Sequence, residues 1–503
     1  GPAVGGANNL WDVEQVEVLL GPQATTQGRN ALAGAVVQWT ADPQYEFGAK
    51  LRVLAGSDET FQGSAMVTGP ILDGQVAYRL SYDHREEDFD GFNVVTQRPF
   101  AYNDANTSRG KLLIEPNAVP NLRVELNISH IDEFTTPTGR ASLPPVDSPE
   151  RETFDPYEFI DYDFRGFELQ NQSTYYIADI TYEINENWRI ASVTTYEETE
   201  NDTQSFGSFA GLRESTAATT AADFRLHFDY QRVDGWIGAY YFTEDISDSS
   251  TNFLDLTTLP FSFEPPGSIL SRNSENTVDI ENAAIYGDLT YQLTDRFSIG
   301  VGARYDIEER FDTGQQGSVS VNNESCVINL GGRLVPCVSL FPITSDPALD
   351  VDYEAFLPRA NLSYALNESS SVSFMVARGY RAGGVQTVGD ANEEFDPEFL
   401  TNYEVVYRSL WMDDKLMFNV NVFFSDWTDQ QLAIPDGLNF RTVNIGESEM
   451  LGAEFYTSYQ FDRGVNVYGT LGLLDTEITN APFAIDEAGN PLPGEPGFAN
   501  LAG

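Results

Sequence analysis

The side chains best suited to chemistry in this sequence are few and lie far apart. Two cysteines, Cys326 and Cys337, are separated by ten residues of a segment rich in Gly, Asn and Pro. The three histidines, His84, His130 and His227, lie elsewhere, so the pattern predicts no metal site. Two thiols could be neighbours by chance or small buried apolar groups, but their position within one loop favours a disulfide formed in an oxidising compartment.

Motifs of known enzyme classes do not point to catalysis. Residues 299–302, Ile-Gly-Val-Gly, begin like a dinucleotide-binding loop, but the third glycine is absent and the alternating sequence predicts no helix after it. A strand with small residues is the better interpretation of this segment. With 77 acidic residues, carboxylate pairs are too common to mark one pair as an acid and a base. We therefore expect no enzyme activity and no cofactor.

The composition of the chain argues against a nucleic-acid partner and against transmembrane helices. Lys and Arg number 28 against 77 Asp and Glu, which gives a net charge of −49 and argues against binding to nucleic acid. The acidity could serve a solvated surface or an acidic vestibule that concentrates cations. The mean hydropathy is −0.30, and the sequence has no apolar run long enough for a transmembrane helix.

Polar and apolar residues alternate from about residue 46 to about residue 478, which predicts strands with one apolar and one polar face. The alternation is clear over residues 297–308 and recurs in 122–129, 224–230 and 416–424. The apolar face of the first segment consists of Phe297, Ile299, Val301, Ala303, Tyr305 and Ile307. Its polar face consists of Ser298, Gly300, Gly302, Arg304, Asp306 and Glu308. A strand of about 9–11 such residues is enough to cross a bilayer.

Alternation alone would also fit a soluble sandwich. Aromatic residues near expected strand ends, such as Trp188 with Tyr196 and Trp236 with Phe242, favour the interfacial girdles of a membrane barrel instead. Connections also alternate between short and long, which is typical of outer-membrane barrels. The short turns are expected at 72–75, 185–187, 231–232, 293–296 and 412–414. The long loops are expected at 135–166, 204–214, 249–275, 312–350 and 384–397.

The alternating segments amount to about 17 strands. Bacterial single-chain barrels have an even number of strands, with both chain ends in the periplasm. An odd count leaves the end of the chain on the outer side, and a plugged transporter has about 22 strands. We therefore expect about five further strands beyond the C-terminal end of this sequence.

Residues 13–43 differ from the rest of the chain. A short strand leads into Gly21-Pro22, a turn that stops strand pairing because proline donates no hydrogen bond. The run 27–34 is small and flexible, as a compact packed loop requires, and residues 35–40 return to extended structure.

At these residues the chain resembles the TonB-dependent receptors, the plugged outer-membrane transporters of Gram-negative bacteria. In that family the plug domain ends with Val-Glu, a short gap, a Gly-Pro turn and then Tyr-Gly-Arg-Asn-Ala-Ile-Gly-Gly. The motif positions that this chain keeps are Glu17, Gly21, Pro22, Gly28, Arg29, Asn30 and Gly34. Departures from the family pattern occur at Leu20, Ala24, Gln27 and Ala33. The resemblance continues at 379–384, 402–404 and 444–447 and covers essentially the whole chain.

The resemblance implies an all-β membrane protein in the outer membrane of a Gram-negative bacterium. Its fold would be an antiparallel transmembrane β-barrel, with about 17 of an expected 22 strands present. Residues 1–44 would be the C-terminal part of a plug domain, whose earlier part is then missing, and residues 45–503 an incomplete barrel domain. The implied activity is active uptake of a scarce, large ligand, most commonly a ferric siderophore. The implied partners are outer-membrane lipid and a TonB-type energy-transducing protein, whose binding segment precedes these residues in the family.

Candidate ligand contacts follow from exposed aromatic and cationic residues. Aromatic residues on a long external loop are costly unless they bind a ligand or pack on each other. The aromatic candidates are Tyr157, Phe159, Tyr162, Phe164 and Phe167. Arg378 and Arg381 could line the inner wall, or could belong to a strand that bends at glycine and turns its cations towards acidic neighbours.

Two other functions remain open at this level. A passive porin-like channel would conduct permanently in a planar bilayer, and a soluble secreted all-β binding or adhesion protein would stay in solution without detergent.

The predicted disulfide is directly testable. Peptide mapping of the oxidised protein under non-reducing conditions should recover Cys326 and Cys337 in one cross-linked fragment. Alkylation of a free thiol at Cys326 would contradict the prediction.

Overall fold

The structure of this protein is a computed structural model. It describes residues 10–27, 29, 31–57, 59–93, 98–136, 159–161, 167–205, 209–256, 268–314, 316–321, 324–325, 327–330, 333–336, 348–388, 391–436, 439–444, 446–462 and 464–480.

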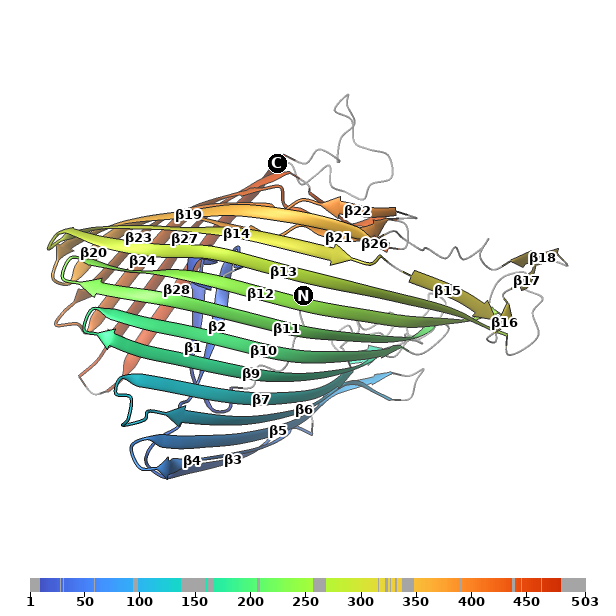
Figure 1. Cartoon of the computed structure of the whole chain (residues 1–503), viewed down its shortest axis with the longest axis horizontal. Helices are drawn as coiled ribbons and strands as arrows, with labels where there is room; N and C mark the ends of the chain where they lie inside the picture. The colour runs from blue at the N-terminus through green and yellow to red at the C-terminus, as the bar shows by residue number, and fades with distance from the viewer. Residues whose placement is uncertain are drawn as a thin grey trace.

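Seventeen long strands form the wall of a barrel in the described part of the chain. They are β3 (Gly48–Ala55), β4 (Phe61–Leu72), β5 (Val76–Asn93), β6 (Arg98–Ile114), β7 (Leu122–Thr136), β9 (Phe167–Asn185), β10 (Trp188–Ser205), β11 (Phe209–Tyr230), β12 (Val233–Asp255), β13 (Ile269–Thr294), β14 (Phe297–Asp312), β19 (Leu349–Asn367), β20 (Ser370–Arg381), β23 (Glu398–Trp411), β24 (Leu416–Thr428), β27 (Glu447–Gln460) and β28 (Asn466–Asn480). From β3 to β28, each wall strand pairs antiparallel with the next wall strand along the chain (Figure 1). The predicted antiparallel barrel and the count of about 17 strands are both confirmed.

The two ends of the barrel differ in their connections. At one end, called here the short-turn end, two residues separate β9 from β10, β11 from β12 and β13 from β14, as predicted. The opposite, long-loop end carries short extra strands (Figure 1). These are β8 (Phe159–Asp161), β15 (Gln316–Val321), β16 (Glu324–Ser325), β17 (Val327–Leu330), β18 (Arg333–Pro336), β21 (Gly384–Val388), β22 (Ala391–Phe395), β25 (Gln431–Asp436) and β26 (Asn439–Asn444).

Several wall strands continue well beyond the expected loop boundaries. β11 begins at Phe209 and β12 ends at Asp255, so most of the expected loop over 204–214 and part of that over 249–275 are strand. β13 has 26 residues, about 85 Å at roughly 3.3 Å per residue, against the 9–11 residues or so that a span needs. Beyond the bilayer both faces of a strand meet water, so the apolar alternation that reveals strands within the membrane disappears from the sequence.

Alternation decides which side chains face outwards. On β14 the outward Val301 and Ile307 are 50% and 41% exposed, whereas the inward Arg304, Asp306 and Glu308 are 1% exposed. The predicted apolar and polar faces of this strand are therefore confirmed. Among the described residues, no helix is long and apolar enough to cross a membrane.

Two aromatic residues expected in an outer girdle lie in the lumen instead. Trp236 contacts Tyr286 with ring centroids 5.0 Å apart, and Phe242 lines an internal cavity. Arginine side chains cover both rings, at 5.2 Å for Arg225 on Trp236 and 4.5 Å for Arg29 on Phe242. Cation–π contacts with lumenal arginines thus account for aromatic residues on the polar side of the wall.

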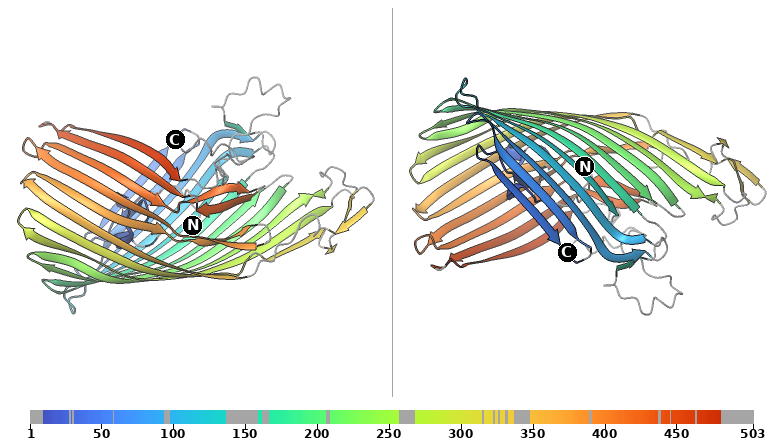
Figure 2. Two further views of the ribbon diagram at one scale, coloured as in Figure 1. Left: turned by 90° about the horizontal axis from the view of Figure 1, so that it is seen from above. Right: turned by 90° about the horizontal axis from the view of Figure 1, so that it is seen from below.

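A hairpin crosses the inside of the barrel (Figures 1 and 2). It consists of β1 (Val13–Leu20), the four-residue helix α1 (Ala24–Gln27) and β2 (Gly34–Thr40), with β1 and β2 antiparallel. Its tip, residues 21–34, is closed by hydrogen bonds from Gly21 N to Ala33 O (3.1 Å) and from Gln23 N to Ala31 O (3.0 Å). The tip contacts β14 and β20, whereas both ends of the hairpin contact β4–β6 on the opposite wall.

The tip sits on an apolar patch inside the barrel. Ala24 packs with Val351, Tyr353 and Leu357 of β19 and with Tyr380 of β20 in one buried cluster. These β19 residues point into the lumen, where they would face water if the tip were absent. Cover by the tip therefore accounts for apolar side chains on the inward face of this strand. Burial of this patch holds α1 against the wall.

Gly34 is required for the hairpin to close. Its φ is +151°, and a Cβ atom there would lie 2.4 Å from the carbonyl oxygen of Leu19. We expect Gly34→Ala to strain the hairpin by about 1–3 kcal/mol. Limited proteolysis of the folded barrel should then cut within residues 13–40 more rapidly than in the unaltered protein.

Gly63→Ala is the matched control, because a Cβ atom there meets nothing nearer than Phe61 at 3.6 Å. Equal cleavage rates in the two variants would contradict the role given to Gly34.

Candidate functional site

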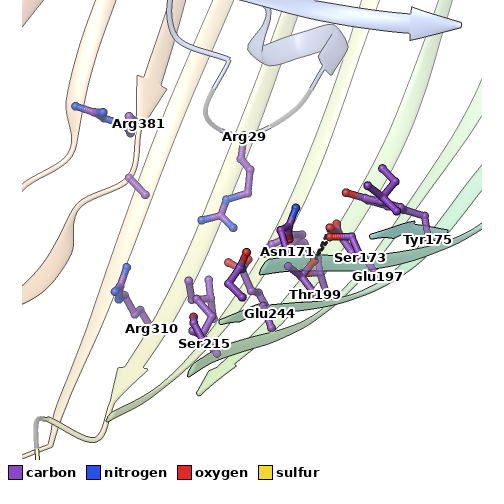
Figure 3. Close-up of a pocket in the computed structure, with 18 of the residues that line it drawn as sticks. Arg29, Asn171, Ser173, Tyr175, Glu197, Thr199, Ser215, Glu244, Arg310 and Arg381 are labelled. Carbon is purple, nitrogen blue, oxygen red and sulfur yellow. Dashed lines mark hydrogen bonds between the residues drawn. The ribbon is translucent and has the colours of Figure 1, made fainter. Parts of the chain in front are cut away.

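A cavity of about 900 Å³ lies inside the barrel between the hairpin and the wall, towards the long-loop end (Figure 3). Its lining combines the tip and β2 with strands from most of the wall. The lining elements of the wall are β6, β7, β9, β10, β11, β12, β13, β14 and β20.

One side of the cavity is cationic. Arg310 of β14 and Arg381 at the end of β20 lie on the left in Figure 3, and Arg29 projects from the tip towards the centre of the view. The Nε atom of Arg310 is buried and has no hydrogen-bond partner among the described residues. Arg381 is paired with Glu398 at 2.6 Å, yet about half of its side chain remains exposed.

The facing side offers carboxylates, hydroxyls and amides. Ser173 on β9 and Thr199 on β10 are 3.1 Å apart, and Thr199 donates a hydrogen bond of 2.9 Å to Glu197 (Figure 3). Glu244 on β12 adds a second carboxylate nearer the arginines, because it pairs with Ile280 of β13, which pairs with Arg310 of β14. The Oδ1 atom of Asn171 is buried and has no hydrogen-bond partner in the described part of the chain. This side can therefore accept hydrogen bonds from a ligand.

The floor of the cavity contains a buried ion pair between the tip and the wall. Arg29 Nη2 lies 3.0 Å from both carboxylate oxygens of Glu308, with side-chain exposures of 13% and 1%. Asn282 donates a further hydrogen bond of 3.4 Å to Glu308, and the Arg29 guanidinium covers the Phe242 ring. Removing one partner of such a pair leaves an uncompensated buried charge, which costs about 3–5 kcal/mol.

Ion pairs also hold the two ends of the hairpin, on the opposite wall. Before β1, Asp12 accepts a 2.9 Å hydrogen bond from Arg79 on β5. After β2, Asp42 lies 2.7 Å from Arg123 on β7, and Lys111 on β6 donates to the carbonyl oxygen of Thr40 at 3.1 Å. The hairpin is thus fixed to two opposite sides of the barrel.

Just beyond these contacts, a tyrosine outside the strands joins the same network. Tyr45 donates a 2.8 Å hydrogen bond to Glu115. Burial and this carboxylate raise the pKa of Tyr45 to about 12, so its hydroxyl remains a donor at physiological pH.

The motif residues predicted from the sequence meet at the tip. A Cβ on Gly21 would lie 3.1 Å from Asn402, and a Cβ on Gly379 would lie 3.0 Å from Pro22, so two glycines allow close contact between tip and wall. Glu17 lies on β1 and accepts a hydrogen bond from Gln15. Gly28 and Asn30 lie outside the described residues.

The candidate ligand contacts divide into three groups. Arg381 lines the cavity, whereas Arg378 lies over the Phe399 ring at 4.2 Å and is not among the described lining residues. The backbones of Phe159 and Phe167 belong to β8 and β9. The predicted residues that fall outside the described part of the chain are Tyr157, Tyr162 and Phe164, together with Cys326 and Cys337 of the predicted disulfide.

Sequence reasoning did not identify most of the cavity. Glu308 appeared on the polar face of its strand, but nothing in the sequence distinguished it from other inward carboxylates. Arg310, Glu244 and Glu197 continue the same period-2 pattern on their strands. The register between strands far apart in sequence brings them together, and a single sequence contains no direct signal for that. In the described residues, no cluster of His, Cys, Asp or Glu has the arrangement of a metal site.

Comparison with known families identifies the barrel. The family model described as TonB dependent receptor-like, beta-barrel matches residues 122–503. The pesticin receptor of Yersinia enterocolitica is 24% identical over 493 residues, which cover 94% of this chain and 64% of the receptor. The chain thus spans just under two thirds of the length of this curated relative.

Solved structures show the same fold. The ferric yersiniabactin uptake receptor FyuA from Yersinia pestis aligns with a TM-score of 0.73 at 20% identity, covering 93% of this chain and 67% of that structure. The siderophore receptor PiuA from Acinetobacter baumannii aligns with a TM-score of 0.71 at 14% identity, covering 96% and 71%. With its barrel, its internal hairpin and the match over residues 122–503, the chain belongs to the TonB-dependent receptors, outer-membrane β-barrel proteins of Gram-negative bacteria.

Proposed function

We propose that this protein imports a large metal chelate of the siderophore class across the outer membrane, driven by a TonB-type energy-transducing partner. The observation that carries the proposal is a polar cavity of about 900 Å³ with a hairpin crossing the lumen at its floor. That volume is near the upper end of the range for small-molecule sites. A permanently open channel would not need a hairpin held to two opposite walls.

The names of relatives support the ligand class. One similar structure is a ferric yersiniabactin uptake receptor and another is a siderophore receptor. We assign the same class of ligand to this chain. We also propose that residues 1–44 are the C-terminal part of a plug domain and residues 45–503 belong to the barrel domain.

The chemistry of the cavity suits such a chelate. A metal bound by several oxygen donors gives a compact complex with anionic groups on its surface, and guanidinium groups bind anions with directed hydrogen bonds. Arg310 offers donors with no ion-pair partner among the described residues, and Arg381 is half exposed. Ammonium or hydroxyl donors of the ligand would meet Glu197 and Glu244, which also line the cavity.

Binding tests the proposal directly. Ferric yersiniabactin is the first probe for the purified full-length protein, in a panel with hydroxamate and catecholate ferric siderophores, and binding is followed by tryptophan fluorescence. We expect one class to bind and Arg310→Gln to raise its Kd about 10- to 100-fold, because a charge-assisted hydrogen bond contributes about 1.5–3 kcal/mol.

Arg408→Gln is the matched control. Arg408 is an exposed arginine on β23, outside the cavity lining in the described residues, so its replacement should leave the Kd unchanged. Absence of binding across the panel, or equal effects of the two variants, would count against the proposal.

The buried ion pair at the tip generates a second expectation, for sealing of the lumen. Arg29→Met leaves Glu308 buried without its cation and should loosen the tip. Planar-bilayer recordings of the full-length variant should then show more frequent channel openings than the unaltered protein.

Arg441→Met is the control for sealing, because Arg441 pairs with Glu393 at 2.6 Å but both side chains are more than a third exposed. Surface pairs of this kind contribute about 0–1 kcal/mol. A closed, silent Arg29→Met variant would contradict the sealing role of this pair.

A further inference from the structure

Two hairpins at the long-loop end are joined to each other and line one edge of the cavity. The first consists of β21 and β22, between β20 and β23, and the second of β25 and β26, between β24 and β27. β26 contacts both strands of the first hairpin (Figure 1). We call these four strands the hairpin pair. The described lining of the cavity includes Phe395, the last residue of β22, and Gln431, the first residue of β25.

Side-chain amides connect one hairpin to the backbone of the other. Gln386 on β21 donates a hydrogen bond to the carbonyl oxygen of Thr442 on β26 and accepts one from its backbone N, at 2.5 Å each. Asn444 at the end of β26 donates to the carbonyl oxygen of Asp396 and accepts from its backbone N, at 2.9 Å each. Each amide thus pairs with both backbone groups of one residue, as a neighbouring strand would. These contacts hold the two hairpins in one fixed arrangement.

One buried carboxylate joins the base of the hairpin pair to the wall. Glu398, the first residue of β23, is 0% exposed. Its Oε2 atom accepts hydrogen bonds from the backbone N of Gln431 at 2.7 Å and from Nε1 of Trp427 at 3.1 Å. Its Oε1 atom lies 2.6 Å from Nε of Arg381. Glu398 therefore connects the ends of β20, β24 and β25 through a single side chain.

Gln431 carries this connection to the first hairpin. Its side-chain amide donates hydrogen bonds to the carbonyl oxygens of Ala382 at 2.9 Å and Asp396 at 3.0 Å. These two residues lie just before β21 and just after β22. Glu398 thus fixes Gln431, and Gln431 fixes both ends of the first hairpin.

Two glycines allow Phe395 to approach the edge of the cavity. A Cβ atom on Gly383 would lie 2.3 Å from the carbonyl oxygen of Phe395, and one on Gly384 would lie 2.5 Å from the Phe395 ring. The ring has no aromatic or guanidinium partner among the described residues. Phe242, the other phenylalanine in the described lining, is covered by a guanidinium group. The Phe395 ring is therefore the one that a ligand can contact without displacing a cation.

We propose that Glu398 is a positioning residue for the cavity, which fixes the hairpin pair and so holds Phe395 as the contact for a planar aromatic group of the ligand. The proposal rests on the uptake function proposed above and assigns one group of the ligand to one edge of the cavity. Aromatic pairs are favourable at defined geometries, and a ring that is already held in place loses little freedom when the ligand binds.

Amide hydrogen exchange of the purified full-length protein tests the joining role without any ligand. The exchange of β21, β22, β25 and β26 is followed by mass spectrometry. Glu398→Ala should accelerate exchange in both hairpins at least about 10-fold, because it removes a buried acceptor and leaves its partners uncompensated. Glu398→Gln keeps an oxygen acceptor for Gln431 and Trp427 and should restore most of the protection.

Arg441→Met is the matched control for hydrogen exchange. It removes a 2.6 Å pair with Glu393 between the same two hairpins, but both of these side chains are more than a third exposed. Exchange should therefore change about twofold or less. Unchanged exchange in Glu398→Ala, acceleration in one hairpin alone, or equal acceleration in Arg441→Met would overturn the joining role.

Binding tests the contact assigned to Phe395. The probes are ferric yersiniabactin and the ferric catecholate and hydroxamate siderophores of the panel above. Phe395→Leu should raise the Kd of the chelate that binds about 3- to 10-fold. Glu398→Ala should raise this Kd at least as much, and adding Phe395→Leu to it should have little further effect, because both substitutions remove one contact. Glu398→Gln should restore most of the affinity.

Phe423→Leu is the matched control for binding. Its ring lies against Gly452 as that of Phe395 lies against Gly384, but Phe423 is outside the cavity lining in the described residues, so the Kd should stay unchanged. Additive effects of Phe395→Leu and Glu398→Ala, an unchanged Kd in Phe395→Leu, or binding of an aliphatic hydroxamate chelate alone would overturn the proposal. Absence of binding across the panel would overturn the ligand class and the contact together, whereas the exchange experiment tests the joining role independently of both.

Discussion

The wall of this barrel separates lipid on the outside from water in the lumen, and this constraint determines the rest of the structure. Every wall strand presents one face to each, so apolar side chains go outwards and polar side chains inwards, and the backbone is paired from strand to strand. The lumen is consequently a polar surface. A segment that is to remain inside it must be held largely by ion pairs and hydrogen bonds, and the hairpin is held in this way at both of its ends and at its tip.

The two attachments of the hairpin share a buried ion pair and differ in the apolar packing present at the tip. Its ends are joined to β5–β7 by a buried pair, Asp12 with Arg79, and by a half-exposed pair, Asp42 with Arg123. The tip is attached by one deeply buried pair, Arg29 with Glu308, and by apolar packing of Ala24. Salt screens the attraction between exposed charges, whereas the attraction within a buried pair is screened much less. Separating a buried pair leaves charges without compensation and is strongly destabilising. Each attachment of the hairpin therefore contains a deeply buried ion pair.

Much of the fold could be predicted from the sequence because the wall obeys a local rule. Period-2 alternation identified both faces of β14, and the turn residues located the short-turn end. The predictions failed at positions where the choice of side chain does not depend on the contrast between lipid and lumen. The strands continue into water, where Asp255 and Ile269 carry no alternation signal, and lumenal rings such as Phe242 are stabilised by arginines rather than by lipid.

The candidate site was less predictable for a different reason. Arg29 was identified because the motif around it is local. Arg310 and Glu244 face the cavity only because β12 and β14 flank β13, and this proximity depends on the register of long-range pairs.

The apolar inner face of β19 bears on the proposed opening of the lumen. Lifting α1 away from the wall would expose Val351 and Leu357 to water in a lumen whose other walls are polar. Hydrophobic attraction of about 25 cal/mol for each square ångström then favours return of the helix. In the proposed transport, parting the two surfaces would thus require work, whereas reclosure would proceed downhill without a further input of energy.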